Sequence, residues 1–138
     1  FRAVTDQTGD SVDFKEIQSQ LGLSSILNQS TDMHTQVRAE SEGDIYPVTT
    51  VSLTDLLVQH NAPQQIDYIS MDTEGSELSI LQAFNFSQFT VDVFTIEHNY
   101  VDDNRKKIFE LMTLNGYQRV FTDLSQYDDW YVRNNLIS

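Results

Sequence analysis

Hydrophobic and polar positions in residues 45–138 alternate between two spacings. Short apolar runs with strand character are followed by stretches whose apolar residues recur at the spacing of an amphipathic helix. The predicted strands are residues 46–51, 66–71, 91–97, 117–122 and 130–136. Strands that alternate with helices favour a mostly parallel sheet with right-handed crossovers. The polar turn between the last two strands predicts a C-terminal antiparallel hairpin.

The helices between these strands have recognisable start signals. Ser52 is the expected N-cap of the first helix, because Asp55 follows it three residues later. The second helix is expected to begin at Ser76, and the third is expected to be capped by Asp102 or Asp103.

Residues 1–44 have a different character. Residues 1–5 and 11–14 are predicted strands joined by a turn, so we expect an N-terminal antiparallel hairpin. Residues 15–44 are rich in Ser, Gln, Asn and Thr and are predicted to form a long polar excursion. We therefore predict one partial α/β domain over residues 1–138, with its α/β core in residues 45–138.

Composition excludes several classes of function. The chain has 8 basic and 21 acidic residues, a net charge of −13, which disfavours binding to nucleic acid or to an anionic membrane surface. The absence of cysteine excludes disulfides, thiolate nucleophiles and cysteine-based zinc sites. No apolar run is long enough for a membrane span or a signal-peptide core. We therefore expect a cytoplasmic enzyme or a fragment of one.

Two of the predicted strands end in clusters of polar side chains. Asp72 and Glu74 follow the second strand, and Glu97, His98 and Asn99 end the third. The carboxyl ends of parallel strands share one rim of a sheet, where α/β folds bind ligands. Acidic residues at such junctions also cap helices. Two acidic ends, one of them with a histidine, nevertheless favour a functional site.

Three chemical roles are open for this rim. A carboxylate or His98 can take a proton from a hydroxyl nucleophile. The side-chain oxygens of Asp72, Glu97 and Asn99 can hold a hard divalent cation. Alternatively, the carboxylates can accept hydrogen bonds from the hydroxyls of a sugar-like substrate. The five glycines are not clustered, so this chain contains no phosphate or dinucleotide cradle.

The strand and turn at residues 66–77, Ile-Asp-Tyr-Ile-Ser-Met-Asp-Thr-Glu-Gly-Ser-Glu, resemble the Asp-x-Glu-Gly-x-Glu signature of FkbM-type methyltransferases. Residues 48–57, 96–99, 115–117 and 128–132 match the family in the same order. The resemblance implies a class I, Rossmann-like sheet with strand order 3-2-1-4-5-7-6. It also implies S-adenosylmethionine as the cofactor and methyl transfer to a hydroxyl of a small molecule, sugar or glycan.

The chain departs from the family pattern at the cofactor site. The family's glycine-rich turn after strand 1 and its acidic residue after strand 2 have no counterpart here. We therefore expect a C-terminal portion of the family domain, with N-terminal strands 1 and 2 missing, that does not bind S-adenosylmethionine by itself. Asp6 is the one candidate for a cofactor contact. Whether the chain alone is an enzyme stays open.

The resemblance assigns roles to the rim. Asp72, Glu97 and His98 are expected to be catalytic and to line the acceptor pocket. Glu74 and Asn99 are expected to contact the substrate, and Glu74 also to bond across the strand-to-helix turn.

Two other functions compete with an O-methyltransferase domain. One is a truncated, non-catalytic α/β module that self-associates or binds a partner without cofactor. The other is an acidic domain that binds sugars or divalent ions without methyl transfer. The missing strands would leave residues 66–71 with an open edge. We therefore expect that the chain forms a homodimer through that edge, packs its N-terminal hairpin against residues 66–71, or is only marginally stable.

Overall fold

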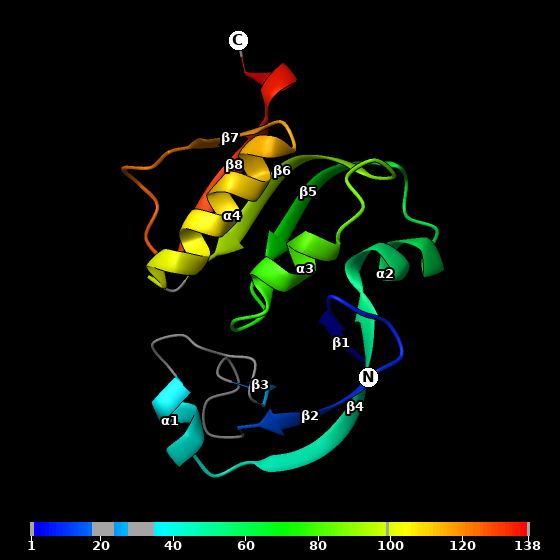
Figure 1. Cartoon of the computed structure of the whole chain (residues 1–138), viewed down its shortest axis with the longest axis vertical. Coiled ribbons are helices and arrows are strands. Elements are labelled where there is room, and N and C mark those ends of the chain that lie inside the picture. Colours follow the sequence, from blue (N-terminus) through cyan, green and yellow to red (C-terminus); the bar gives the residue numbers. More distant parts are fainter. Residues whose placement is uncertain (1, 18–23, 28–34, 99, 138) are drawn as a thin grey trace.

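The computed structural model describes residues 2–17, 24–27, 35–98 and 100–137, which form two four-stranded sheets with accompanying helices. The sheets lie end to end along the long axis of the molecule, and β4 and α2 connect them (Figure 1). The chain is therefore of the mixed α/β class.

The N-terminal sheet has the strand order β1-β4-β2-β3. Its strands are β1 (Arg2–Thr5), β2 (Ser11–Glu16), β3 (Ser25–Ile26) and β4 (Asp44–Ser52), and the helix α1 (Thr35–Glu40) precedes β4. Strand β1 is parallel to β4, whereas β2 is antiparallel to β4 and to β3.

The predicted hairpin of residues 1–5 and 11–14 is wrong, because β4 lies between these two strands. Thr49 of β4 is in register with Arg2 on one edge and with Ser11 on the other. The connection from β1 to β2 crosses the end of β4, where the Gly9 N–H donates to the Thr50 carbonyl at 3.1 Å. Strand β4, which comes later in the chain, thus pairs with both β1 and β2, which were expected to pair with each other.

The C-terminal sheet has the strand order β5-β6-β8-β7. Its strands are β5 (Gln65–Met71), β6 (Thr90–Glu97), β7 (Tyr117–Val120) and β8 (Asp128–Arg133), followed by the short 3-10 helix η2 (Asn134–Leu136). Strands β5 and β6 are parallel, and the hairpin of β7 and β8 is antiparallel, as predicted. Strand β8 also pairs antiparallel with β6. Both sheets are therefore mixed, and the predicted mostly parallel Rossmann-like sheet is not confirmed.

The helices begin close to their predicted starts. They are α2 (Leu53–Gln59), α3 (Glu77–Ala83) and α4 (Asp102–Leu114). The Ser52 cap is confirmed, because its hydroxyl oxygen accepts the Asp55 N–H at 3.1 Å. The predicted aspartate cap of α4 is wrong: Val101 is the N-cap residue, and both aspartates lie in the first turn, where they favour the helix dipole. No helix in the described part of the chain is long and apolar enough to cross a membrane.

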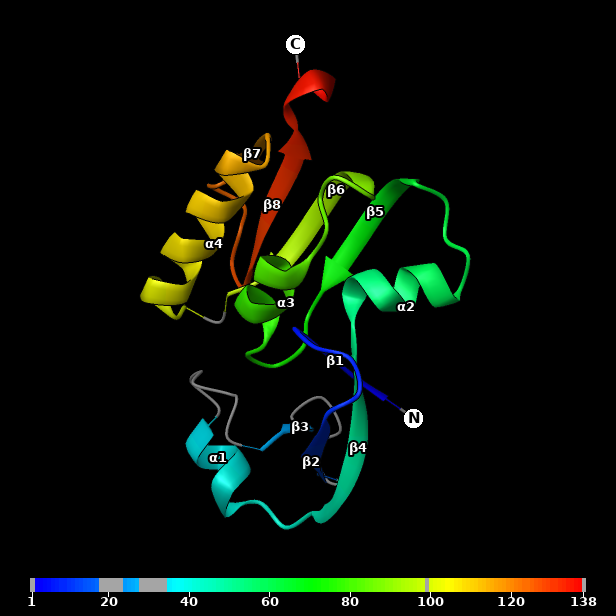
Figure 2. The ribbon, with the colours of Figure 1, turned by 45° about the vertical axis from the view of Figure 1, so that its right-hand side comes forward.

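The main hydrophobic core lies between the C-terminal sheet and helices α3 and α4, which cover the same face of that sheet (Figure 2). Phe94, Tyr131, Leu81 and Met112 are completely buried there. The phenol of Tyr117 also enters this core and donates to the Val91 carbonyl at 2.8 Å. This packing holds the carboxyl ends of β5 and β6 in place.

The opposite face of the C-terminal sheet is partly exposed, and one of its edges is open. Tyr68 and Trp130 on that face are 53% and 43% exposed. Among the described strands, β5 pairs only with β6, so its outer row of backbone N–H and carbonyl groups faces no strand. Such an edge can pair with a second chain.

We propose that the chain self-associates through the outer edge of β5. Sedimentation velocity is expected to show a dimer that dissociates on dilution. Tyr68→Lys, which places a charge on that edge, is expected to give a monomer. Val37→Lys is the control, because Val37 is 43% exposed on α1, which accompanies the N-terminal sheet. A monomeric wild-type chain at every concentration would contradict the proposal.

Candidate functional site

The carboxyl ends of β5 and β6 lie side by side, as the sequence predicted. Met71 is in register with Ile96. Asp72 and Glu97, the next residue on each strand, therefore lie beside each other. One carboxylate oxygen from each of Asp72, Glu77 and Glu97 lies within 4.8 Å of the other two. Three acidic side chains therefore meet at this rim.

Glu77 holds the turn between β5 and α3. It is buried, and one of its oxygens accepts the Thr73 N–H at 2.7 Å and the Thr73 hydroxyl at 2.9 Å. The Gly75 N–H donates to both of its oxygens, at 3.2 and 3.1 Å. The sequence analysis assigned a bond across this turn to Glu74, and that assignment stays a prediction. Glu74 occupies the left-handed region, with φ of 59°, and lines a cleft.

Since Glu77 is committed to the turn, Asp72 and Glu97 are the carboxylates of this group that remain available to a ligand. The sequence analysis named Asn99 as a further oxygen ligand and a substrate contact, and Asn99 lies outside the described residues. A divalent cation at this rim stays a prediction.

Glu97 has the most strongly perturbed acidity at this rim. Burial, together with the charge of Asp72 and a hydrogen bond with it, raises the pKa of Glu97 to about 8. Its Oε2 atom is buried without a hydrogen-bond partner. Asp128, in register with Glu97 on β8, also has a raised pKa, because of burial and the nearby charge of Asp72. Because its pKa is raised to about 8, Glu97 keeps its proton at neutral pH.

His98 lies beside Asp129 and is only 5% exposed. Its Nδ1 atom accepts the Tyr100 N–H at 3.1 Å, and its Nε2 atom lies 3.9 Å from the nearer Asp129 oxygen. Burial and the charge of Arg105 lower the pKa of His98. The ring is therefore neutral with the proton on Nε2. His98 is therefore buried beneath the rim. The catalytic role predicted for it stays a prediction.

Asp129 joins α4 to the hairpin of β7 and β8. It is 1% exposed, and it accepts two hydrogen bonds from Arg105, at 2.8 and 2.7 Å, and one from Arg119, at 3.2 Å. Burial raises the pKa of Asp129, but the hydrogen bonds and charge of Arg105 outweigh it and hold that pKa below its usual range. Asp129 thus binds both arginines and connects α4 to β7.

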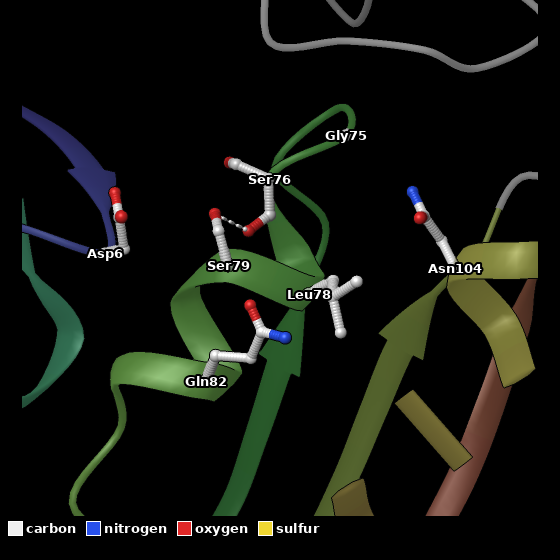
Figure 3. Close-up of a pocket in the computed structure, with 7 residues that line it drawn as sticks. All are labelled: Asp6, Gly75, Ser76, Leu78, Ser79, Gln82 and Asn104. Carbon is white, nitrogen blue, oxygen red and sulfur yellow. Dashed lines mark hydrogen bonds between the residues drawn. The ribbon is translucent and has the colours of Figure 1, made fainter. Parts of the chain in front are cut away.

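Two clefts border the rim. The first, of about 320 Å³, lies between the end of β1, the start of α3 and the start of α4 (Figure 3). Asp6, the predicted cofactor contact, lines it across from Ser76 and Ser79, with Asn104 on a third side. The second, of about 230 Å³, lies between the two sheets. Asp72 and Glu74 line one of its walls, and residues 2–4, 14 and 24–26 line the other.

The model of the methyltransferase FkbM domain family matches residues 3–123 of this chain. The chain belongs to the FkbM methyltransferase family. The resemblance seen in the sequence is thereby confirmed. No curated protein and no solved structure matches the chain.

The structure assigns several residues to the acidic rim that the sequence did not. Glu77 belongs to the family signature, but its role was not predicted from the sequence. Its signal was local: a glutamate at the first position of a helix can accept N–H groups of the preceding turn. The register of β8 against β6 brings Asp128 to the rim, and the packing of α4 brings Arg105 there. No sequence spacing indicates those contacts.

Replacement of Glu77 tests its role in the turn. Glu77→Gln keeps the size of the side chain but removes the charge and one acceptor oxygen, so it is expected to lower the free energy of unfolding by about 1–3 kcal/mol. Urea denaturation followed by circular dichroism measures this. Glu110→Gln is the matched control, because Glu110 is an exposed residue of α4. Equal stability of the two variants would sink the proposed role.

The raised pKa of Glu97 predicts how stability depends on pH. Because the folded-state pKa of about 8 lies above the ordinary value of 4.5, the stability that this proton contributes is complete below about pH 4.5 and is lost as the pH rises through about 8. Glu97→Gln cannot titrate, so its free energy of unfolding is expected to fall less steeply over this window. Denaturation curves at a series of pH values measure both slopes. Identical slopes would show that Glu97 titrates normally.

Proposed function

We propose that this chain supplies the acceptor side of an S-adenosylmethionine-dependent O-methyltransferase that acts on a hydroxyl of a small molecule, sugar or glycan. The observation that carries the proposal is the carboxylate pair of Asp72 and Glu97, at the edge of an open cleft in a member of a methyltransferase family. Methylation of a hydroxyl oxygen requires that its proton be removed, and a carboxylate at the site can accept it.

The two carboxyl groups suit different parts of this task. Asp72 is exposed at the cleft, so its carboxylate can accept a hydrogen bond from an acceptor hydroxyl and then take its proton. Glu97 keeps its proton at neutral pH and shares a hydrogen bond with Asp72, so it holds the Asp72 carboxylate in place beside the cleft.

The described residues fit one part of S-adenosylmethionine, which supplies the methyl group when it is bound. Its sulfonium centre is positive and suits an acidic rim whose neighbouring arginines are already paired with Asp129. Asp6, Ser76, Ser79 and Asn104 offer donors and acceptors for an adenosine at the larger cleft. The sequence has no glycine-rich turn for the remainder of the cofactor.

We propose on this basis that the chain is the C-terminal portion of a family domain. The open outer edges of β1 and β5 in the described sheets support a partial domain. The competing function is a non-catalytic module that self-associates. The open edge of β5 favours it, and it predicts no methyl transfer in any longer form of the protein.

Calorimetry with S-adenosylmethionine is expected to show no binding to this chain alone. A form that includes the glycine-rich turn is expected to transfer the labelled methyl group to a hydroxylated acceptor. In that form, Asp72→Asn is expected to lower kcat by roughly 10²–10⁴-fold, which is more than it lowers cofactor affinity, because the proton acceptor is lost.

Asp67→Asn is the control for this substitution, since Asp67 is an exposed aspartate of β5 itself. Unchanged turnover in Asp72→Asn would refute the role of Asp72. The absence of methyl transfer in the longer form would favour the non-catalytic module.

A further inference from the structure

The cleft of about 230 Å³ between the two sheets has walls of different chemistry. Its far wall is one face of the N-terminal sheet. Phe14 is in register with Ile26 on β3 and with Tyr46 on β4, so these side chains share a face. Ala3 is in register with Thr50, which lies on that same face because side chains alternate along β4. The sheet thus presents Ala3, Phe14 and Ile26 to the cleft.

This far wall is apolar and well supported. Ala3 and Ile26 are each 8% exposed. Both belong with Val48 to a small buried cluster, and Phe14 packs against it. The Phe14 ring also lies 5.9 Å from the Tyr46 ring, at an angle of 48°, so β4 supports its position. A flat apolar ligand can therefore gain contacts on this side of the cleft.

The near wall is the turn between β5 and α3, which carries Asp72. Several other polar groups of the cleft are already engaged. The Thr73 hydroxyl donates to Glu77 at 2.9 Å, and the Ser76 hydroxyl donates to the Thr73 hydroxyl at 2.9 Å. The Ser24 hydroxyl oxygen accepts a backbone N–H at 3.0 Å. A ligand with many hydroxyls would therefore lose hydrogen bonds to water here, whereas a single hydroxyl can bond to the exposed Asp72.

The size and charge of the cleft narrow the ligand further. An apolar cavity of about 150 Å³ holds one benzene molecule, so a cleft of about 230 Å³ suits a single substituted ring. Asp72 and Glu74 on the near wall repel an anion. Arg2 on the far wall is engaged with Gln59, to which it donates at 2.7 Å. A neutral flat ring with one hydroxyl fits these features.

We propose that this cleft binds a phenol, with its ring against Phe14 and its hydroxyl at Asp72. The inference rests on the proposed function, whose acceptor hydroxyl it narrows to a phenolic one. A phenol also suits a carboxylate, which is a weak base. The pKa of a phenol is about 10, as in tyrosine, whereas an aliphatic alcohol holds its proton about as tightly as water, with a pKa of about 15.7. Asp72 can therefore take a phenolic proton more readily than that of a sugar hydroxyl.

Methyl transfer to a phenol in the longer form of the protein uses these groups in one step. The phenolic O–H bond breaks, and its proton passes to the Asp72 carboxylate and from there to solvent. The phenol oxygen bonds to the methyl carbon of S-adenosylmethionine. The bond from that carbon to sulfur breaks, and its electron pair stays on sulfur, which loses its positive charge. Phe14 only holds the ring and takes no part in the bonds that change.

NMR titration of this chain tests the site without requiring methyl transfer. The probes are phenol, anisole, cyclohexanol and methyl β-D-glucopyranoside, each at up to about 10 mM, a range that detects millimolar affinity. Phenol is expected to shift the backbone amide signals of Ala3, Phe14 and Thr73. Anisole has no hydroxyl proton to donate to Asp72 and is expected to bind on the order of tenfold more weakly. Cyclohexanol, whose ring is not flat, and the glucoside are also expected to bind more weakly.

Replacement of Phe14 tests the far wall. Phe14→Ala is expected to weaken phenol binding on the order of tenfold, because the ring contact is lost. Phe14→Leu keeps an apolar side chain in the wall, so it serves if the smaller residue disturbs the sheet, and it is expected to weaken binding less. Phe109→Ala is the matched control, since Phe109 is 39% exposed on α4 and lies outside the residues that line the cleft. It is expected to leave phenol binding unchanged.

Replacement of Asp72 tests the near wall. In Asp72→Ala, phenol and anisole are expected to bind equally, because the phenolic hydroxyl has lost its acceptor. A preference for phenol that survives in this variant would refute the contact with Asp72.

The inference as a whole is overturned if phenol shifts none of these amide signals, or if any other probe binds as tightly as phenol. Unchanged phenol binding in both Phe14 variants would overturn it as well. Its failure is separable from that of the proposed function. Methyl transfer by the longer form to an aliphatic alcohol or a sugar, but not to a phenol, would refute the inference alone. Phenol binding without methyl transfer would refute the proposed function and leave the binding site standing.

Discussion

The constraint on which the rest of this structure depends is the crowding of carboxylates at the carboxyl ends of β5 and β6. Parallel pairing brings Asp72 and Glu97 next to each other, and Glu77 follows at the start of α3. Like charges at this separation repel, and burial makes the repulsion stronger. Glu77 is compensated by N–H and hydroxyl donors of the turn, whereas Glu97 keeps its proton. The remaining negative charge is left at the exposed Asp72, where a ligand can reach it.

A second network fixes the other side of the rim. Asp129 draws Arg105 from α4 and Arg119 from β7 into one buried cluster, and His98 lies against that cluster. The arginine bonds connect α4 to the hairpin of β7 and β8. The network sets two arginines against one aspartate and lies beside the acidic rim.

Membership of the FkbM family places these features in a functional context. The family match spans β1 to the loop after β7, and so includes both the clefts and the acidic rim. The carboxyl groups of Asp72 and Glu97 carry the proposed acceptor chemistry. The sequence has no glycine-rich turn of the kind that holds the cofactor in this family.

Much of the local structure followed from the sequence, because its signals are local. Apolar periodicity located the five strands and three helices of residues 45–138, and the Ser52 cap and the final hairpin are as predicted. The signature at residues 66–77 identified the family, and the ends of β5 and β6 located the acidic rim. Spacing along the chain determines these features, since each depends on neighbours in sequence or on two adjacent strands.

The tertiary structure decided which distant segments meet. It placed β4 between β1 and β2, where a hairpin was expected. The longer strand β4 pairs with both of them, although it comes later in the chain. The tertiary structure gave the turn bonds to Glu77 and turned His98 toward Asp129 and Tyr100. It also set the raised pKa of Glu97, which depends on burial and on a charge from another strand. The sequence by itself determined which groups are available, and only the packing of elements far apart in the chain determined their partners and protonation.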